Sequence, residues 1–460
     1  MRSYYFVLLL FALLTVFACR KTEIIDNSAN ATLQFSTDSI LFDTVFTNAG
    51  STNRVLKIFN YNKNSVVLSS IKLKGGSNST FKININGAAV NELNNVKIRG
   101  NDSIYVFVKA FIDPNNDSTP FLVEDELQLN LNGNQSIIPI AAYGQNAVYL
   151  NKAILNTNTT FLKGKPYIIY DYAIVNTGVT LNINSGARVY FHKNAKLFIS
   201  GSLQASGTLT DSITFTSDRT ERIYDDEPGQ WEGLHFLRNS FDNKINYAVI
   251  KNALAGIRVD SLSNNNNPKL LLTNSIIKNH EVAGILGYTA SITGINNLVY
   301  NCGQYLLIGL YGGNYNFYQN TFANYNFNFP RRSPSLYFSD NLEGNGAKVY
   351  PLNTQFTNNI IFGSLTKEID FDKKGNLAFV QDFKFNAIKT DVQNLGNTNF
   401  YNLDPLFLNP RRENYLLPSN SNAHEKGQDL STNIYFNSFI NKDISGKNRI
   451  FPSTLGCYQK

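Results

Sequence analysis

The chain has 460 residues, with 41 Lys and Arg against 34 Asp and Glu, and a formal net charge of +7. This charge is mild and the basic residues are scattered, which argues against a nucleic-acid partner. Of the 3 cysteines, Cys302 lies in a repeat and Cys457 at the C-terminal end. These positions favour two packed or free thiols over a bridge.

The N-terminus has the parts of an export signal. A basic residue precedes an apolar run at residues 5–17, and this run of about thirteen residues is too short to span a bilayer. Val16 stands three positions before Cys19, and the small residue Ala18 stands directly before it. This pattern resembles the lipobox of bacterial lipoproteins. The resemblance implies a signal peptide at 1–18 and a membrane partner through lipid on Cys19. The alternative is an ordinary signal peptide with an incidental cysteine.

The first folded part is predicted to be a sandwich of short strands. Residues 19–30 are polar and short of aromatics, as expected of a lipid-anchored tether. Alternate residues of 104–110 are apolar, and Leu127, Leu129 and Leu131 alternate with polar residues, which is the pattern of half-buried antiparallel strands. Roughly seven such strands over 31–148 fit an immunoglobulin-like β-sandwich without the cysteine pair of antibody domains.

A different pattern of apolar residues begins near residue 149. Apolar pairs separated by one residue recur about every eight residues between 181 and 215, with glycines between them. Strands this short cannot bury a face alone, and three of them make a solenoid coil of about 24 residues.

A second repeat follows downstream. The segment at 274–279 aligns with those at 297–301, 320–324 and 359–363, and each begins with Asn. This alignment predicts that Ile276, Val299 and Phe322 are stacked inward positions. Asn suits coil corners because it tolerates the left-handed conformation, and stacked Asn side chains form ladders. The repeats predict a parallel β-helix.

Several segments of the second part carry a family resemblance. Residues 166–216 and 228–233, and the closing motifs at 404–407 and 443–446, resemble right-handed parallel β-helix proteins of bacterial surfaces, of the pectate-lyase-like superfamily. With the sandwich before it, the layout is similar to lipoproteins of Bacteroidota. The resemblance implies an all-β chain with an N-terminal immunoglobulin-like β-sandwich and a right-handed parallel β-helix at 149–460, which includes the closing segment.

No motif predicts catalytic residues, a metal site or a cofactor. The four histidines lack metal-ligand spacing. The acidic run at 225–227 is interpreted as a solvated loop, and the Arg pairs at 331–332 and 411–412, each beside a proline, as solvated turns. Enzymes on β-helices need clustered carboxylates, which the sequence does not assemble.

Two sets of residues are candidates for recognition or modification. Aromatic rings beside amides suit a sugar-binding groove, and the alternative is that the rings stack inside the β-helix. The candidate ligand-binding residues are Trp231, Tyr311, Tyr315, Tyr318 and Tyr325. Triplets of Asp, Ser or Thr, and an aliphatic residue resemble the O-glycosylation sequon of Bacteroidota, although a turn Asp before a strand gives the same triplet. The candidate sites are Ser39, Thr44, Ser103, Ser212 and Ser261.

These observations favour a cell-envelope surface lipoprotein that presents a non-catalytic β-helix to a glycan or a protein. The expected location is the outer membrane, on its periplasmic or cell-surface side. Two alternatives stay open: a polysaccharide lyase or glycoside hydrolase that uses the β-helix groove, and a purely structural envelope component.

The lipobox resemblance makes Cys19→Ala the first test. The substitution removes the sulfur that would carry the lipid, so we expect unprocessed precursor and no incorporation of an alkyne fatty acid during metabolic labelling. Cys302→Ala, which leaves the N-terminus intact, should be labelled like the wild type. Labelling that survives in Cys19→Ala would contradict the assignment.

Overall fold

The structure is a computed structural model that describes residues 23–117, 119–327, 330–342 and 348–460. Cys19 therefore lies outside the described residues. Contacts divide the chain into two compact units, residues 1–146 and 147–460, and each has its own core. Within the described ranges, no helix is both long and apolar enough to cross a membrane.

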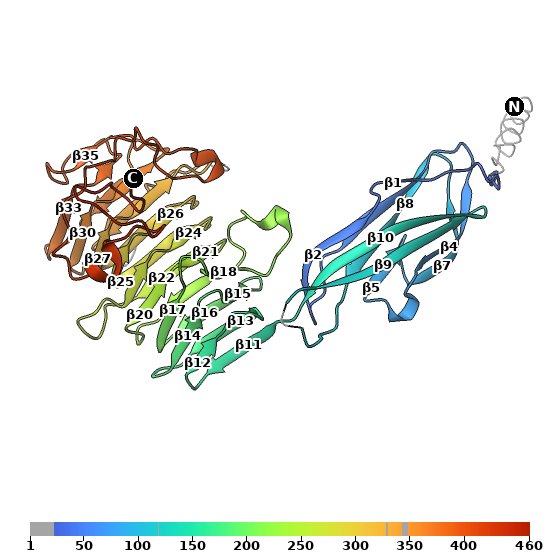
Figure 1. The fold of residues 1–460 in the computed structure, drawn as a ribbon, viewed down its shortest axis with the longest axis horizontal. Helices are drawn as coiled ribbons and strands as arrows, with labels where there is room; N and C mark the ends of the chain where they lie inside the picture. Colours follow the sequence, from blue (N-terminus) through green and yellow to red (C-terminus); the bar gives the residue numbers. More distant parts are fainter. Residues whose placement is uncertain (1–22, 118, 328–329, 343–347) are drawn as a thin grey trace, which may run out of the picture. The chain divides into compact units, whose positions relative to one another are not determined.

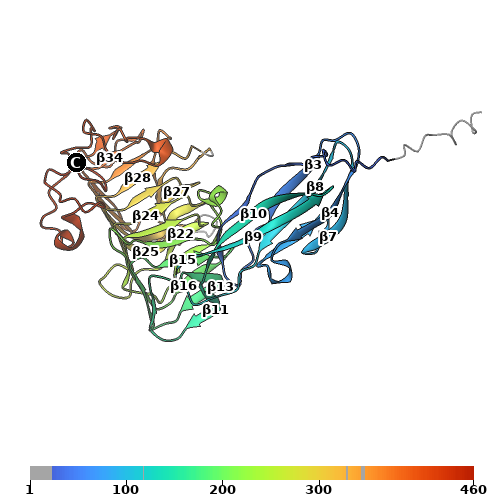
Figure 2. The same cartoon turned by 45° about the vertical axis from the view of Figure 1, so that its right-hand side comes forward.

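The first unit consists of two five-stranded sheets that enclose one hydrophobic core (Figure 2). Paired strands run antiparallel except β2 and β10. One sheet has the order β1 (Gln34–Phe35), β3 (Arg54–Asn60), β8 (Asp102–Ala110), β5 (Phe81–Ile85) and β6 (Ala88–Ala89). The other has the order β2 (Ile40–Phe46), β10 (Asn134–Gln145), β9 (Phe121–Leu131), β4 (Val66–Leu73) and β7 (Glu92–Ile98). A 3₁₀ turn, η1 (Gly76–Asn78), follows β4.

Period-two patterning accounts for the core of this unit. Ile104, Val106 and Val108 point inward from β8, and Leu127 and Leu129 do so from β9. A tight turn follows β9, where the left-handed pair at 132–133 joins it to β10. The sequence pattern therefore places these strands and their faces correctly.

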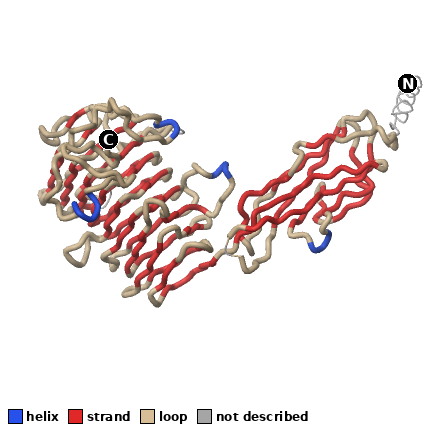
Figure 3. The backbone as a smooth tube through the Cα atoms, viewed as in Figure 1, coloured by secondary structure: helices blue, strands red, loops and turns tan. Residues whose placement is uncertain are grey.

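The second unit is a 25-stranded, all-parallel stack of short strands, consistent with a β-helix (Figures 1 and 3). The all-β prediction is confirmed. The first strands are β11 (Val148–Leu155), β12 (Thr159–Phe161), β13 (Tyr167–Val175), β14 (Thr180–Asn184), β15 (Arg188–Phe191), β16 (Lys196–Ile199), β17 (Ser202–Ser206), β18 (Ile213–Ser217), β19 (Gly233–Phe236), β20 (Asn243–Asn246), β21 (Ala248–Lys251), β22 (Ala255–Asp260) and β23 (Leu270–Thr273).

The remaining strands are β24 (Ile276–Lys278), β25 (Ala283–Ile295), β26 (Leu298–Tyr300), β27 (Tyr305–Tyr318), β28 (Thr321–Asn324), β29 (Leu336–Ser339), β30 (Leu352–Thr357), β31 (Ile360–Gly363), β32 (Ile369–Asp372), β33 (Phe379–Lys384), β34 (Ala387–Ile388) and β35 (Phe400–Tyr401). Short turns of 3₁₀ or π type form η2 (Arg222–Tyr224), η3 (Pro410–Arg412) and η4 (Phe436–Ile440).

Each coil pairs with the coil before and the coil after it, so inward side chains stack into one core. The predicted apolar pairs are fully buried; Leu181 and Ile183 of β14, for example, pair with Leu203 and Ala205 of β17. Aromatic rings continue these stacks, as where Phe356 lies parallel to Phe383 with centroids 4.7 Å apart. Period-two patterning and the coil length thus account for the interior.

A buried asparagine ladder lines one corner of the later coils. Asn297, Asn320, Asn359, Asn386 and Asn399 each precede a strand, and the amide nitrogen of each of the first four donates to the amide oxygen of the next asparagine over 2.9 to 3.0 Å. The same oxygens accept backbone N–H groups from the preceding coil. A buried backbone N–H group without an acceptor costs free energy. The ladder supplies these acceptors at the corner.

The predicted register was wrong by one residue at β24. Val299 pairs with Phe322, as expected, but the residue that stacks on Val299 is Ile277 and not Ile276. Ile277 is fully buried in the β-helix core. Ile276 points outward and is half-buried under the C-terminal segment. Two adjacent isoleucines gave the alignment no way to choose between them.

The C-terminal segment beyond β35 covers the outer face of the last coils. Tyr300 and Phe362 point outward from their strands and pack with Tyr415 and Leu455 of this segment. Arg449 is buried here; its guanidinium donates to the amide oxygen of Asn296 and to carbonyl oxygens nearby, and burial lowers its pKa to about 10. This packing closes the end of the solenoid.

The structure shows whether Arg331 and the two cysteines are buried or exposed. Arg331 was expected in a solvated turn, but it is buried and forms a 2.6 Å ion pair with the buried Glu368. Cys302 and Cys457 are buried and unbridged, as expected, and burial raises the pKa of each thiol to about 12.

The corrected register predicts opposite behaviour for two neighbouring substitutions. Ile277→Asp buries a carboxylate without a partner, so it should cost at least about 3 kcal/mol of unfolding free energy and open the coil around β24 to proteolysis. Ile276→Asp disturbs only the contact with the C-terminal segment, so new cuts should fall after residue 403. Limited proteolysis with thermal melting separates the two patterns. Equal effects at both positions would contradict this register.

Candidate functional site

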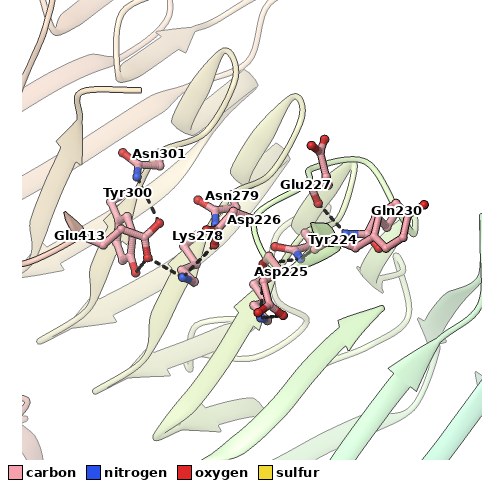
Figure 4. Close-up of polar contacts among 12 residues, drawn as sticks. Tyr224, Asp225, Asp226, Glu227, Gln230, Lys278, Asn279, Tyr300, Asn301 and Glu413 are labelled. Atoms are coloured by element: carbon pink, nitrogen blue, oxygen red, sulfur yellow. Dashed lines mark hydrogen bonds and ion pairs between the residues drawn. The ribbon is translucent and has the colours of Figure 1, made fainter. Parts of the chain in front are cut away.

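The acidic loop between β18 and β19 is held against the outside of the β-helix (Figure 4). The amide nitrogen of Asn252 donates to the carbonyl oxygens of Tyr224 and Asp225, at 3.1 and 2.9 Å. Asn279 donates to a carboxylate oxygen of Asp226 over 3.0 Å. The loop is exposed, as predicted, but these contacts hold it in place.

The two asparagines that hold the loop belong to an outer row of three asparagines at one corner. Asn252, Asn279 and Asn301 follow β21, β24 and β26 directly, and all three have positive φ values, of 67°, 56° and 51°. Asn is one of the few residues that enter this left-handed region readily. The turn therefore directs three amides outward from successive coils, where Asn252 and Asn279 are buried beneath the acidic loop and Asn301 is half-buried.

The site has two walls: the acidic loop is the first, and the C-terminal segment is the second. After the turn η3, Glu413 turns its carboxylate toward the coil corner and accepts hydrogen bonds from Tyr300 at 2.9 Å and Asn301 at 3.4 Å. The Tyr415 hydroxyl donates to Asn301 over 3.0 Å. These contacts fix the segment onto the outer row, and Figure 4 shows those of Glu413.

Lys278 links the two walls. Its ammonium lies 2.5 Å from an oxygen of Glu413 and 3.6 Å from an oxygen of Asp226, so these two oxygens lie within about 6 Å of each other. Burial opposes ionisation of Glu413, but the hydrogen bonds and charge of Lys278, with Tyr300, outweigh it and hold the pKa of Glu413 below its usual value. Burial raises the pKa of Tyr300, which keeps its hydroxyl a donor.

A cavity of about 340 Å³ lies between the walls. We call it the corner groove, and it is lined by Asp226, Pro228, Asn279, Asn301, Asn326, Phe327, Arg411, Arg412 and Glu413. Phe327 keeps 47% of its surface exposed, and the Arg411 guanidinium lies 4.8 Å from its ring centroid. The groove therefore combines amides, ions of both signs and one exposed ring.

This composition suits recognition better than acid–base chemistry. A general acid needs a carboxyl group that holds its proton near neutral pH, whereas Glu413 is held ionised. Among the described residues, no group of three or more His, Cys, Asp or Glu side chains could hold a metal ion. What the groove offers is amide donors and acceptors beside an aromatic face.

The aromatic candidates named from the sequence do not line this groove. Trp231 and Tyr315 are fully buried, so their assignment as ligand-binding residues was wrong. The Trp231 ring stacks on Phe191 at 3.9 Å inside the core. These rings complete the interior stacks because a solenoid core accepts large side chains as readily as a binding face does.

The other three aromatic candidates are half-buried against neighbours. Tyr311 lies 4.5 Å from Tyr350, ring to ring. Tyr325 packs beside Tyr415 under the C-terminal segment, and Tyr318 packs against the cluster around η4. Phe327 was part of the same aromatic stretch but was not selected, and only the packing of distant segments shows that its ring faces a cavity.

The five sequon positions differ in their surroundings. Ser212 is exposed, whereas Ser39, Thr44 and Ser103 are partly exposed. Ser261 accepts a 2.8 Å hydrogen bond from Lys269, so its hydroxyl is already part of a local network. Whether any of these positions carries a glycan stays a prediction.

Comparisons with known proteins find no family for this chain and only weak structural similarities. No protein-family model matches the chain, and no curated protein matches it. Among solved structures, a family 123 glycoside hydrolase from Clostridium perfringens is 10% identical over 28% of this chain and 30% of its own, with a TM-score of 0.20. The catalytic domain of a family 87 α-1,3-glucanase, in complex with tetrasaccharides, is 11% identical over 75% and 80%, with a TM-score of 0.19. Similarities this weak do not assign a function to this chain.

The bridge through Lys278 gives a pH-dependent prediction. Because the pKa of Glu413 is lowered in the folded chain, its ionised form stabilises the C-terminal wall above the ordinary carboxyl pKa, and this contribution is lost as pH falls through the lowered value. Glu413→Gln should therefore raise hydrogen exchange of residues 409–415 at pH 7 by about tenfold. The melting temperatures of variant and wild type should converge toward pH 3.

Asp382→Asn is the matched control, because it removes one side of an exposed ion pair with Lys384, and such pairs contribute little. If residues 409–415 of Glu413→Gln exchange their amide hydrogens at the wild-type rate, the ion pair between Lys278 and Glu413 does not hold the C-terminal segment in place.

Proposed function

We propose that this protein is a cell-envelope surface lipoprotein whose β-helix binds a saccharide in the corner groove without catalysis. The observation that carries the binding proposal is the exposed ring of Phe327 beside a row of asparagine amides. Sugars present apolar faces that pack on aromatic rings and hydroxyl groups that bond to amides. The lipid anchor rests on the lipobox pattern around Cys19.

The coil geometry favours a linear saccharide over a compact ligand. Asn279 and Asn301 follow paired strands of successive coils, and neighbouring strands are about 4.8 Å apart. Similar donors and acceptors thus recur at a fixed interval along the helix axis. A chain of sugars presents its hydroxyl groups at regular intervals too, so it meets equivalent partners on each coil.

The charges in the groove are compatible with an uncharged or an anionic sugar. Lys278 neutralises part of the charge of Asp226 and Glu413. Arg411 and Arg412 are exposed, and neither forms an ion pair among the residues that the structure describes. Guanidinium groups donate several hydrogen bonds in a fixed plane, which suits hydroxyl and carboxylate groups alike.

Binding is tested with the fragment 23–460 on a glycan array, followed by calorimetry with the oligosaccharides that bind. Phe327→Ala should weaken binding about tenfold, because it removes the stacking surface. Tyr143→Ala is the control, since Tyr143 is similarly exposed, with 53% of its surface accessible, but belongs to the sandwich. If Phe327→Ala binds like the wild type, or if no oligosaccharide binds, the proposal fails.

A carbohydrate-active enzyme is the second candidate, favoured by one observation. The oxygens of Asp226 and Glu413 that contact Lys278 lie within about 6 Å of each other, close to the spacing of about 5 to 5.5 Å between the carboxyl groups of retaining glycosidases. The low pKa of Glu413 opposes an acid role. New reducing ends or unsaturated products that disappear in both Asp226→Asn and Glu413→Gln would establish this alternative over non-catalytic binding.

A further inference from the structure

One outward face of the sandwich is unusually apolar. Val55 of β3 and Tyr105 and Phe107 of β8 keep 46, 43 and 37% of their surface exposed, and Tyr61, just beyond β3, keeps 61%. The alternate residues of both strands fill the core, so these side chains all point away from it. A solvated sheet face normally carries polar residues at such positions, and a contiguous apolar patch marks a contact surface.

The rings on this face lie beside one another in register. Val55 is paired with Phe107, and Lys57 with Tyr105, across the β3–β8 ladder. The rings of Phe59 and Tyr61 are nearly parallel, with centroids 5.4 Å apart. Those of Tyr105 and Phe107 are stacked with centroids 6.3 Å apart. Two adjacent strands thus present a band of aromatic surface.

Three lysines give this face a positive charge. The Lys57 ammonium lies 4.9 Å from the ring centroid of Phe59 and 5.2 Å from that of Tyr105. Lys82 and Lys109 are cross-strand partners at the end of the band. Within the described residues none of these amines forms an ion pair, and the outward positions of β3, β5 and β8 hold no carboxylate.

We propose that this face, the aromatic–lysine face, binds an acidic polysaccharide. Sugar rings would pack on Tyr105 and Phe107 while carboxylate or sulfate groups pair with Lys57, Lys82 and Lys109. The charge selects the partner: three ammonium groups that form no ion pair among the described residues attract an anionic chain and offer a neutral one only hydrogen bonds. The aromatic surface favours a ligand with an apolar ring face over a free anion, because a free anion gains nothing from the rings. This inference does not depend on the corner groove.

The test uses the fragment 23–460 and four probes: polygalacturonate, chondroitin sulfate, neutral dextran and phosphatidylglycerol vesicles. We expect both acidic polysaccharides to bind and dextran not to bind. Binding should weaken as salt rises, because exposed charges are screened. The double variant Tyr105→Ala with Phe107→Ala should lose about tenfold in affinity, and so should Lys57→Gln combined with Lys109→Gln.

Two controls separate this surface from others. Lys72→Gln removes a lysine from the opposite sheet and should not change binding, and Phe327→Ala should leave binding at this face intact even where it weakens binding in the groove. All variants are outward-facing, so their melting curves should match that of the wild type. The proposal is overturned if dextran binds as tightly as the acidic chains, if only the vesicles bind, or if the lysine variants bind like the wild type.

Discussion

Backbone N–H groups buried at the corners of a solenoid must find acceptors, and the asparagine ladder is how this chain provides them. Each amide oxygen from Asn320 to Asn399 accepts both a backbone and a side-chain N–H of the preceding coil. An amide can donate and accept at once, so one residue per coil connects coils in series. The ladder also fixes the register of the strand that follows it. The positions of the outer row, and of the acidic loop and C-terminal segment that bond to it, depend on that register.

The corner groove arises where two additions to the regular coils meet. The acidic loop is inserted between β18 and β19, and η3 belongs to the closing segment, yet both end on the same outer row of asparagines. Neither addition would form a site alone. Lys278, at the end of β24, lies between them and compensates the charge of each. A residue on the regular scaffold thus determines the spacing of two irregular segments.

Local patterns predicted the regular part of this chain well. The alternation of apolar residues identified the inward faces of β8, β9 and β14, and the recurrence of Asn identified the coil corners.

The same reasoning failed where one sequence pattern is compatible with two different placements of a residue. Ile276 and Ile277 are equally apolar, and the contact that covers Ile276 comes from the distant closing segment. Trp231 and Tyr315 suit a binding face and a core stack alike. Arg331 was placed in solvent because its partner, Glu368, lies on another coil. The groove itself needed three segments that only the coil stacking brings together.

The corner groove is the proposed saccharide site. The most direct measurement is a crystal structure of residues 23–460 with an oligosaccharide that binds in solution. We expect a sugar ring against Phe327, with hydroxyl groups bonded to Asn279 or Asn301 and the saccharide chain running along the helix axis. An oligosaccharide bound elsewhere on the β-helix, with the groove holding only solvent, would rule out the groove as the binding site.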